Sequence, residues 1–263
     1  MSDAPLPRSP FAGTIDFSDD TPIHPIDPDA LARALQAHQL YVETGQHSGQ
    51  RANLDATDLT GKSFAGMKLR HIRMQRADLA GADFTGADLR RAILIGATMQ
   101  GGRIAAADLT RGRLSGIILT DAYCPGACLA EADIEFAILA NSDFREADFR
   151  DADMSGVILD GANLSGADLR GANLRGASFQ NTLLSGADLR DARMGGAILK
   201  RASLKDADLR GAYLRVAKFH RTDLKGADLR GVEGLTGKQI DRAILDCDTR
   251  LPPDVTTEPG NGD

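Results

Sequence analysis

Carboxylates are the side chains of this chain that could most readily act as acids and bases or hold a cation. Most of the aspartates recur at one fixed place in a five-residue repeat, so the repeat itself accounts for their number. An aspartate at a sharp turn accepts hydrogen bonds from nearby backbone amides, and we expect that role here. We identify no catalytic residue and expect that the protein is not an enzyme.

The histidines and cysteines do not indicate a metal site either. Cys124 should point inward and Cys128 outward, while Cys247 lies beyond the repeats, and three cysteines cannot all pair. His38 is expected to be a partly buried packing residue. The histidines are scattered along the chain as His24, His38, His47, His71 and His220. We therefore expect no metal and no cofactor.

A five-residue repeat positions all of these groups. From Leu54 to Leu229 a bulky apolar residue occupies every fifth position, through thirty-six pentads without an insertion or deletion. The residue two places before each of these centres is nearly always small, and it is alanine in twenty-five of the thirty-six pentads. A period of five fits neither an α-helix nor a half-buried strand. Such a repeat indicates a solenoid.

The pentad has a simple geometry when its apolar centre is called i. Residues i−2 and i point to the same side of an extended chain, so both should face one interior. Glycine holds position i+2 in half of the pentads, as expected where the chain bends sharply with positive φ. Four pentads then form a square turn, and residues twenty apart stack on one another.

Several pentads resemble the A-(D/N)-L-x-x signature of the pentapeptide-repeat proteins. The nearest are ADLRG at 167–171, 207–211 and 227–231, and ANLRG at 172–176. The resemblance extends from Ala52 to Gly231. It implies an all-β solenoid, a right-handed quadrilateral parallel β-helix of about nine coils. At about 4.8 Å per coil the rod would be roughly 43 Å long.

The two ends of such a rod need covers, because unpaired strand edges associate with other chains. Residues 26–51 should form an N-terminal helical cap and linker, with Asp27 as N-cap and Pro28 after it. Residues 232–251 should form a C-terminal helical cap that carries Ile240, Ile244 and Leu245 on one side. The β-helix would then occupy 52–231. Residues 1–25, which are rich in proline and acidic side chains, and 252–263 are expected to be disordered.

The N-terminus shows no signal-peptide pattern, and no apolar run has the length of a membrane span. We expect a cytoplasmic protein of bacterial type that does not enter a membrane.

One column of the rod is charged. It carries aspartates at i−1 and, at i+1, the arginines Arg150, Arg170, Arg190, Arg210 and Arg230. These arginines form either a ladder of exposed Asp–Arg pairs, each worth about 0–1 kcal/mol, or a strip that binds anions or an acidic partner. The adjacent aspartates favour the ladder.

A second column is apolar, although its residues should point outward. It contains Ile118, Ile138, Ile158 and Ile198, with Phe136 at a neighbouring corner. A stacked column of isoleucines forms a continuous patch, unlike single exposed apolar side chains. It is either an external ladder that stabilises the rod or a surface for a partner or a homodimer, and the residues leave both interpretations open.

Relatives in the quinolone-resistance group imitate duplex DNA and bind topoisomerase, which needs an extended acidic surface. The chain has a net charge of −6, but residues 52–230 sum to +2, so the negative excess lies in its ends. The acidic side chains of the rod gather in an acidic belt of about one and a half coils, flanked by basic coils. The belt comprises Glu131, Asp133, Glu135, Asp143, Glu146, Asp148, Asp151 and Asp153.

Direct binding of nucleic acid would use the basic C-terminal coils. Their cations are Arg193, Lys200, Arg201, Lys205, Arg215, Lys218, Arg221 and Lys225. No exposed aromatic residues alternate with them, which disfavours nucleic acid as a ligand. We therefore predict a non-enzymatic scaffold for protein–protein interaction whose partner the sequence does not identify. DNA-mimic binding of a type II topoisomerase is the alternative, and direct nucleic-acid binding is the second alternative.

Overall fold

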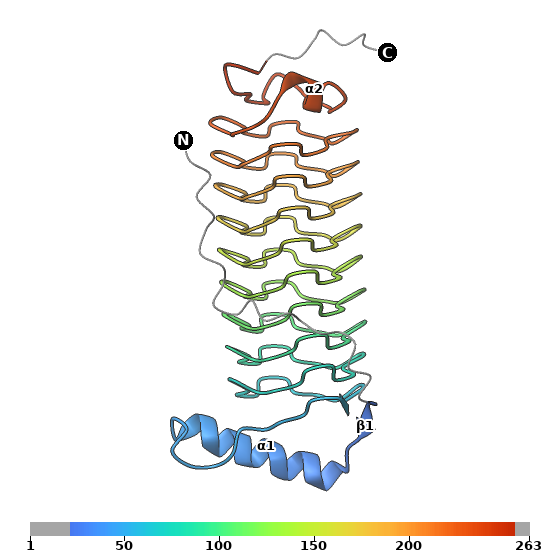
Figure 1. The fold of residues 1–263 in the computed structure, drawn as a ribbon, viewed down its shortest axis with the longest axis vertical. Coiled ribbons are helices and arrows are strands. Elements are labelled where there is room, and N and C mark those ends of the chain that lie inside the picture. Colours follow the sequence, from blue (N-terminus) through green and yellow to red (C-terminus); the bar gives the residue numbers. More distant parts are fainter. Residues whose placement is uncertain (1–21, 256–263) are drawn as a thin grey trace.

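A rod of stacked coils forms the body of the protein, in a computed structural model that describes residues 22–255. The elements along the chain are β1 (His24–Pro25), α1 (Pro28–Glu43), β2 (Thr57–Asp58) and α2 (Gly237–Ile240). Helix α1 lies across one end of the rod and α2 lies at the other (Figure 1). The coils themselves contain no long strands, because each straight segment is only a few residues long before the chain turns.

Parallel backbone pairing joins each coil to the next at a constant spacing of twenty residues, from Asn53↔Arg73 to Asp208↔Asp228. The amide of each pentad centre donates to the following coil, as Leu169 does to the carbonyl of Asp188 at 2.7 Å. The residue before the centre donates to the preceding coil, as Asp168 does to Ala147 at 2.9 Å. The register of four pentads per coil, predicted from the sequence, is confirmed.

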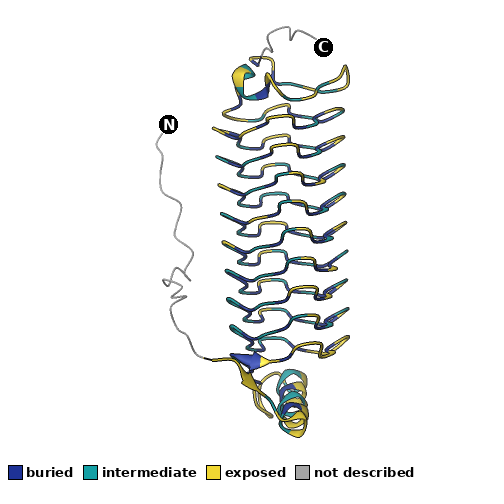
Figure 2. Ribbon diagram, turned by 90° about the vertical axis from the view of Figure 1, so that its right-hand side faces the viewer, coloured by how far each residue is buried: buried dark blue, intermediate teal, exposed yellow. Residues whose placement is uncertain are grey.

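The interior is a narrow apolar column along the axis of the rod. Buried residues recur along every coil from one end of the rod to the other (Figure 2). Every pentad centre from Leu54 to Leu229 is buried, and so are most of the small residues two places before them. Where a hydroxyl replaces alanine it bonds to the backbone: Thr182 donates to the carbonyl of Leu159 at 2.8 Å, and Thr222 to that of Leu199 at 2.6 Å. The two inward positions of the pentad therefore agree with the sequence analysis.

The corners share one backbone conformation. All thirty-six residues at position i+2, from Ala56 to Gly231, have positive φ. Half of them are not glycine, and an L-residue in this left-handed region costs roughly 1 kcal/mol or more. Phe136 and Val216, both with φ of 56°, are the bulkiest apolar residues held in this way.

The N-terminal end is closed by a helix and a short strand. The carboxylate of Asp27 accepts from the amide of Ala30 at 2.8 Å and caps α1, which buries Leu31 and His38 against the first coil. Strand β1 pairs with β2 in parallel, His24 opposite Thr57. The predicted boundary of the disordered tail at residue 25 is therefore wrong, because His24–Pro25 form strand β1 of the fold. Residues 1–21 of that tail lie outside the described residues.

The C-terminal end differs from the prediction. Helix α2 ends at Ile240, so Ile244 and Leu245 do not lie on it. Ile244 instead pairs with Asp223, and Arg250 pairs with Asp228. The last coil presents unpaired backbone groups, and an extended chain can satisfy them whereas a helix cannot. The predicted tail at 252–263 also begins too early, since Pro252 and Val255 are buried, and residues 256–263 lie outside the described residues.

Candidate functional site

Three of the four predicted isoleucines stack directly on consecutive coils. Backbone pairing places Ile118 beside Ile138 and Ile138 beside Ile158, whereas Ser178 separates Ile158 from Ile198. Ile118 and Ile138 are half-buried and Ile158 is 39% exposed. Their side chains leave the rod at i−1, so the exposed part of each contributes to its outer surface. We call Ile118, Phe136, Ile138 and Ile158 the isoleucine patch.

Phe136 is the most exposed member of this patch, at 61%. It lies at a corner with φ of 56°, where glycine is the favoured residue. Its ring lies over Gly156, the corner residue at the same position on the next coil. A Cβ added to Gly156 would be 2.7 Å from Cδ1 of Phe136. The protein thus holds a large apolar ring at the surface in an unfavourable backbone conformation. Its place in the pentad could have revealed this from the sequence.

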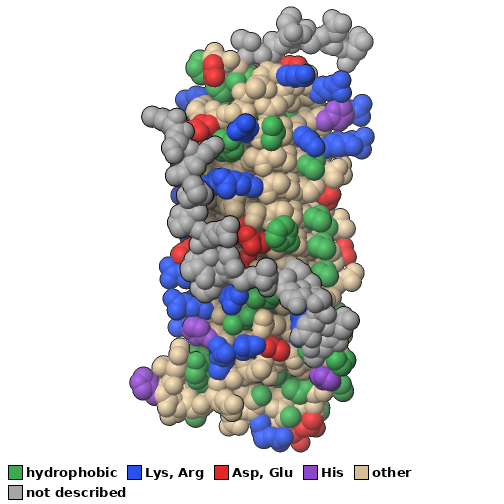
Figure 3. All heavy atoms as spheres, in the orientation of Figure 1, with side chains coloured by type: hydrophobic (Ala, Val, Ile, Leu, Met, Phe, Trp, Pro, Cys, Tyr) green, Lys and Arg blue, Asp and Glu red, His purple; other side chains and the backbone are tan. Residues whose placement is uncertain are grey.

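Hydrophobic side chains gather at mid-height on one face of the rod, and acidic side chains adjoin them (Figure 3). Glu135 directly precedes Phe136. Asp133 lies two residues before Glu135, and Asp153 pairs with Asp133 from the next coil. Burial, and then the charge of Asp153, raise the pKa of Glu135. The apolar patch therefore has a negative rim on one side.

The acidic belt surrounds the rod rather than following one side of it. Asp133 and Asp153 lie in one column, Asp143 in another, and Asp148 in a third. Three members form ion pairs: Glu131 with Arg111 at 2.8 Å, Asp143 with Arg145 at 2.7 Å and Asp148 with Arg150 at 2.5 Å. No ion pair with Asp133, Glu135, Glu146, Asp151 or Asp153 is present in the described part of the chain. The belt is a partly neutralised ring.

A shallow groove of about 710 Å³ crosses this ring. Arg91 and Arg111 line one part of it, and Asp133, Asp151 and Asp153 line another. Its two parts have opposite charge, so it does not form an acidic track.

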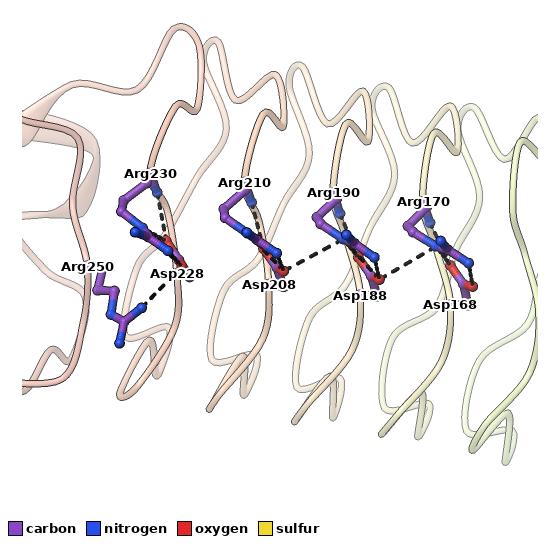
Figure 4. Close-up of polar contacts among 9 residues, drawn as sticks. All are labelled: Asp168, Arg170, Asp188, Arg190, Asp208, Arg210, Asp228, Arg230 and Arg250. Carbon is purple, nitrogen blue, oxygen red and sulfur yellow. Dashed lines mark hydrogen bonds and ion pairs between the residues drawn. The ribbon is translucent and has the colours of Figure 1, made fainter.

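The predicted arginine strip is a ladder of ion pairs, and contacts between coils link its pairs as far as Arg190 and Asp208 (Figure 4). Nε of Arg170 donates to Oδ1 of Asp168 at 2.8 Å and Nη2 donates to Oδ2 at 2.5 Å. The same guanidinium lies 3.5 Å from Asp188 on the next coil. Arg150, Arg190, Arg210 and Arg230 repeat the bidentate contact with the aspartate two residues earlier.

These pairs shift both partners in the expected directions. Hydrogen bonding to Arg210 lowers the pKa of Asp208, and the same bonds raise the pKa of Arg210. A guanidinium that already contacts a carboxylate is a poor receptor for another anion. The geometry of this column is that of a solvated ladder.

Unpaired cations do occur at the C-terminal end of the isoleucine column. Lys205 pairs with Asp223 at 3.4 Å, but Lys200, Arg201, Lys218 and Arg221 have no ion pair within residues 22–255. Partial desolvation, and then the charges of nearby arginines including Arg242, lower the pKa of His220. A groove of about 610 Å³ separates this cluster from α2. Sequence reasoning missed His220 and Arg242 because one was a scattered histidine and the other lies beyond the repeats.

The remaining candidate groups are dispersed. His38 is fully buried, and the amide of Ala52 donates to its Nδ1 at 3.1 Å. Burial raises the pKa of the Cys124 thiol, and Cys128 is half-buried with its Sγ 3.2 Å from Oγ1 of Thr110. In the described ranges, no three His, Cys, Asp or Glu side chains are placed to hold a metal ion. Neither described helix has the length and apolarity to span a bilayer.

Comparisons with known proteins agree on one architecture. The family model of pentapeptide repeats matches residues 72–111, 127–166, 162–201 and 197–232. HetL, a pentapeptide repeat protein involved in heterocyst differentiation regulation from the cyanobacterium Nostoc sp. strain PCC 7120, has a similar structure. The two are 27% identical over 89% of this chain and 100% of HetL, with a TM-score of 0.57.

Two further solved structures are less similar. QnrB1, a plasmid-mediated fluoroquinolone resistance protein, is 20% identical over 72% of this chain and 92% of its own, with a TM-score of 0.40. A pentapeptide repeat protein from the thylakoid lumen of Arabidopsis thaliana is 32% identical over 37% of this chain and 68% of its own, with a TM-score of 0.37. No curated protein matches the chain.

Proposed function

The chain belongs to the pentapeptide-repeat family, and we propose that it is a non-enzymatic scaffold that binds a protein partner through the isoleucine patch. In this proposal the rod is right-handed, as in its family, with about nine coils and a cap at each end. A location in the cytoplasm, expected from the sequence, belongs to the same proposal.

The observation that carries the proposal is the state of Phe136. A large apolar ring that is 61% exposed contributes little to folding, and its left-handed backbone costs free energy. Val216 has the same φ and is 66% exposed, so these two properties alone do not mark a function, and Phe136 is distinguished by its place beside the stacked isoleucines. Phe136 occupies the corner two residues before Ile138, which stacks on Ile118 and Ile158, so several partly exposed apolar side chains share this part of the surface.

The surroundings of the patch fit a protein interface. Such interfaces have an apolar centre that excludes water and a polar rim that orients the partner. Glu135 and Asp133 supply charge on one side of the patch, and Asn141 lies at the corner on its other side. HetL takes part in a regulatory process, and a regulatory role through protein binding would be compatible with this scaffold.

The charge distribution disfavours DNA mimicry. A duplex carries about one negative charge per 1.7 Å along its whole length. The belt here surrounds the rod at one level, and three of its carboxylates already contact arginines. A topoisomerase partner remains the alternative only through contacts that do not imitate DNA.

Affinity capture with matched variants tests the proposal. Phe136→Gly removes the exposed ring and leaves a residue suited to the corner, so the fold should be retained. Val216→Gly makes the same change at a corner of the same edge, four coils away. A partner that binds the wild type and Val216→Gly but not Phe136→Gly supports the proposal that the isoleucine patch binds it. A partner that binds both variants as well as the wild type contradicts the proposal.

A further inference from the structure

We propose that the face containing the isoleucine patch is the interface of a homodimer, in which a second copy lies antiparallel against the first. The two-fold axis would cross the rod at the coil of Ile138. This inference rests on the proposed function, because the same patch forms the centre of the interface, and it identifies the partner as another copy of this chain.

The charges of the column that contains Ile138 divide into two halves. One unbroken register of backbone pairs connects Asp58, Asp78, Thr98, Ile118, Ile138, Ile158, Ser178, Ile198 and Lys218. Beyond Pro25 of β1, which pairs with Asp58, the column carries two aspartates, then three stacked isoleucines, and Ile198 and Lys218 at its far end. Neither aspartate has an ion pair within residues 22–255, and neither does Lys218.

An antiparallel copy would bring opposite charges together. With the axis at Ile138, each Ile118 faces Ile158 of the other copy, and each Ile138 faces its own counterpart. Asp58 lies four coils before Ile138 and Lys218 lies four coils after it. Each distance is roughly 19 Å, so Asp58 of one copy faces Lys218 of the other.

The neighbouring columns are complementary in size. The unpaired cations Lys200, Arg201 and Arg221 would face the small residues Ala80, Gly81 and Gly61 respectively. These three long basic side chains would therefore lie over small residues of the second copy, close to its Asp58 and Asp78. Phe136 lies at the level of the axis and would stack against the same residue of the second copy.

Like charges exclude the parallel arrangement. A two-fold axis along the rod would place Lys218 of one copy against Lys218 of the other and Asp58 against Asp58. Juxtaposed like charges are costly at an interface, whereas the antiparallel copy pairs Asp58 with Lys218 at both ends and places Asp78 opposite Ile198. The acidic and basic ends of this column are therefore best explained by a second copy.

Charge reversal tests the pairing by sedimentation velocity of the full chain. The wild type should dimerise as its concentration rises, and less so in high salt. Asp58→Lys alone and Lys218→Asp alone should each weaken dimerisation by at least about tenfold, because each creates two like-charged contacts. The double variant should restore it. The two sites lie eight coils apart in one chain, so only contacts between copies can produce that rescue.

Cross-linking tests the position of the axis. Ile138→Cys in a Cys247→Ser background should form a disulfide with its own counterpart under mild oxidation. Ser178→Cys in the same background should not, because Ser178 would face Thr98. A cross-link at residue 178 without one at 138 would overturn the geometry.

The outcomes separate this inference from the scaffold proposal. A wild type that stays monomeric at its highest soluble concentration overturns the dimer, while capture of another protein through Phe136 would still support the scaffold. A dimer that survives Ile138→Lys and both single charge reversals overturns the proposed interface. A dimer lost with Ile138→Lys and rescued by the double reversal supports both.

Discussion

Each residue in the coils has a role set by its place in the pentad. The corner position shows most clearly how the backbone conformation restricts the choice of side chain. Every corner has positive φ, yet half of the corners carry side chains. Asparagine and aspartate tolerate this conformation, and several corners use them. Valine does not, because a β-branched side chain clashes with the backbone there.

Val216→Gly should therefore stabilise the protein, by about 1 kcal/mol, although Val216 is an apolar residue on a β-helix. The side chain is 66% exposed, so its removal costs little buried surface. The reverse change, Gly176→Val at the same edge, should destabilise by a similar amount, since a Cβ there meets nothing within 4 Å and only the backbone is strained. Chemical denaturation measures both, and a stabilising Gly176→Val would contradict the argument.

Neighbouring residues in one pentad should differ sharply in their sensitivity. Leu169→Asp should unfold the middle coils, because an unpaired carboxylate in the fully buried site costs several kcal/mol against a small total stability. Asp168→Ala should cost about 1 kcal/mol or less, since its pairing with Arg170 is partly exposed. Thermal unfolding followed by circular dichroism compares them, and equal effects would mean that the register is wrong.

His38 should make the N-terminal cap sensitive to acid. Burial is the main cause that lowers the pKa of His38 below 6.5 in the folded protein. The unfolded chain therefore binds the proton more readily, and the stability that depends on neutral His38 is lost as the pH falls below about 6.5. His38→Asn keeps an acceptor for the amide of Ala52 but does not titrate. The difference in free energy of unfolding between the wild type and this variant should shrink as the pH falls below about 6.5. A difference that does not change with pH would contradict the assignment of this acid sensitivity to His38.

Among the elements, the coils could be predicted from the sequence and the ends could not. The same residue pattern recurs in every pentad from Leu54 to Leu229, so the inward centres and the twenty-residue register could be recognised. Each end of the rod has a structure of its own that no repeat predicts. The pairing of β1 with β2 and of Ile244 with Asp223 depends on which backbone groups the terminal coils leave free. That information lies in the folded rod rather than in a local pattern.

The same difference applies to the candidate surface. Spacing alone placed Ile118, Ile138 and Ile158 in one column, and the structure adds the exposure of Phe136 over Gly156. The cluster around His220 includes Arg242, which reaches it from beyond the repeats. The repeat pattern cannot predict that a residue outside the repeats lies near His220.

The C-terminal cap should keep the rod from growing. The amide of Leu224 donates to Ile244 and that of Leu229 donates to Arg250, both at 2.8 Å. Removing residues 236–263 would leave these edge groups unpaired and should produce soluble oligomers or fibres. Removing only 256–263 is the control and should not. Light scattering distinguishes them, and a monomeric long truncation would show that the cap is not a needed cover.

At the scale of the whole molecule, charge is distributed in a way that no single residue reveals. The rod body sums to +2, with its acidic belt at mid-length and basic coils on both sides. Long-range electrostatics then steer partners to particular levels of the rod rather than along its full length. This distribution limits which macromolecules the rod can imitate or attract.

Purified protein should therefore leave the supercoiling activity of DNA gyrase unchanged at micromolar concentration. Over the roughly 43 Å of the rod, a duplex would present about 25 negative charges, on all sides and in a regular order. Here the belt holds eight of the acidic residues at one level, three of them paired with arginines. The flanking cations would repel an enzyme surface that binds DNA.

A supercoiling assay, run with and without a quinolone, measures this directly. The matched variant replaces Lys200, Lys218 and Arg221 by glutamate, which removes the net positive charge of residues 161–230 without touching the interior. If charge alone decides the outcome, the variant should interfere with gyrase more than the wild type does, while both remain weak. Inhibition or quinolone protection by the wild type at submicromolar concentration would contradict the prediction. The enzyme would then recognise a local surface of the rod, because the charge of the body cannot substitute for DNA.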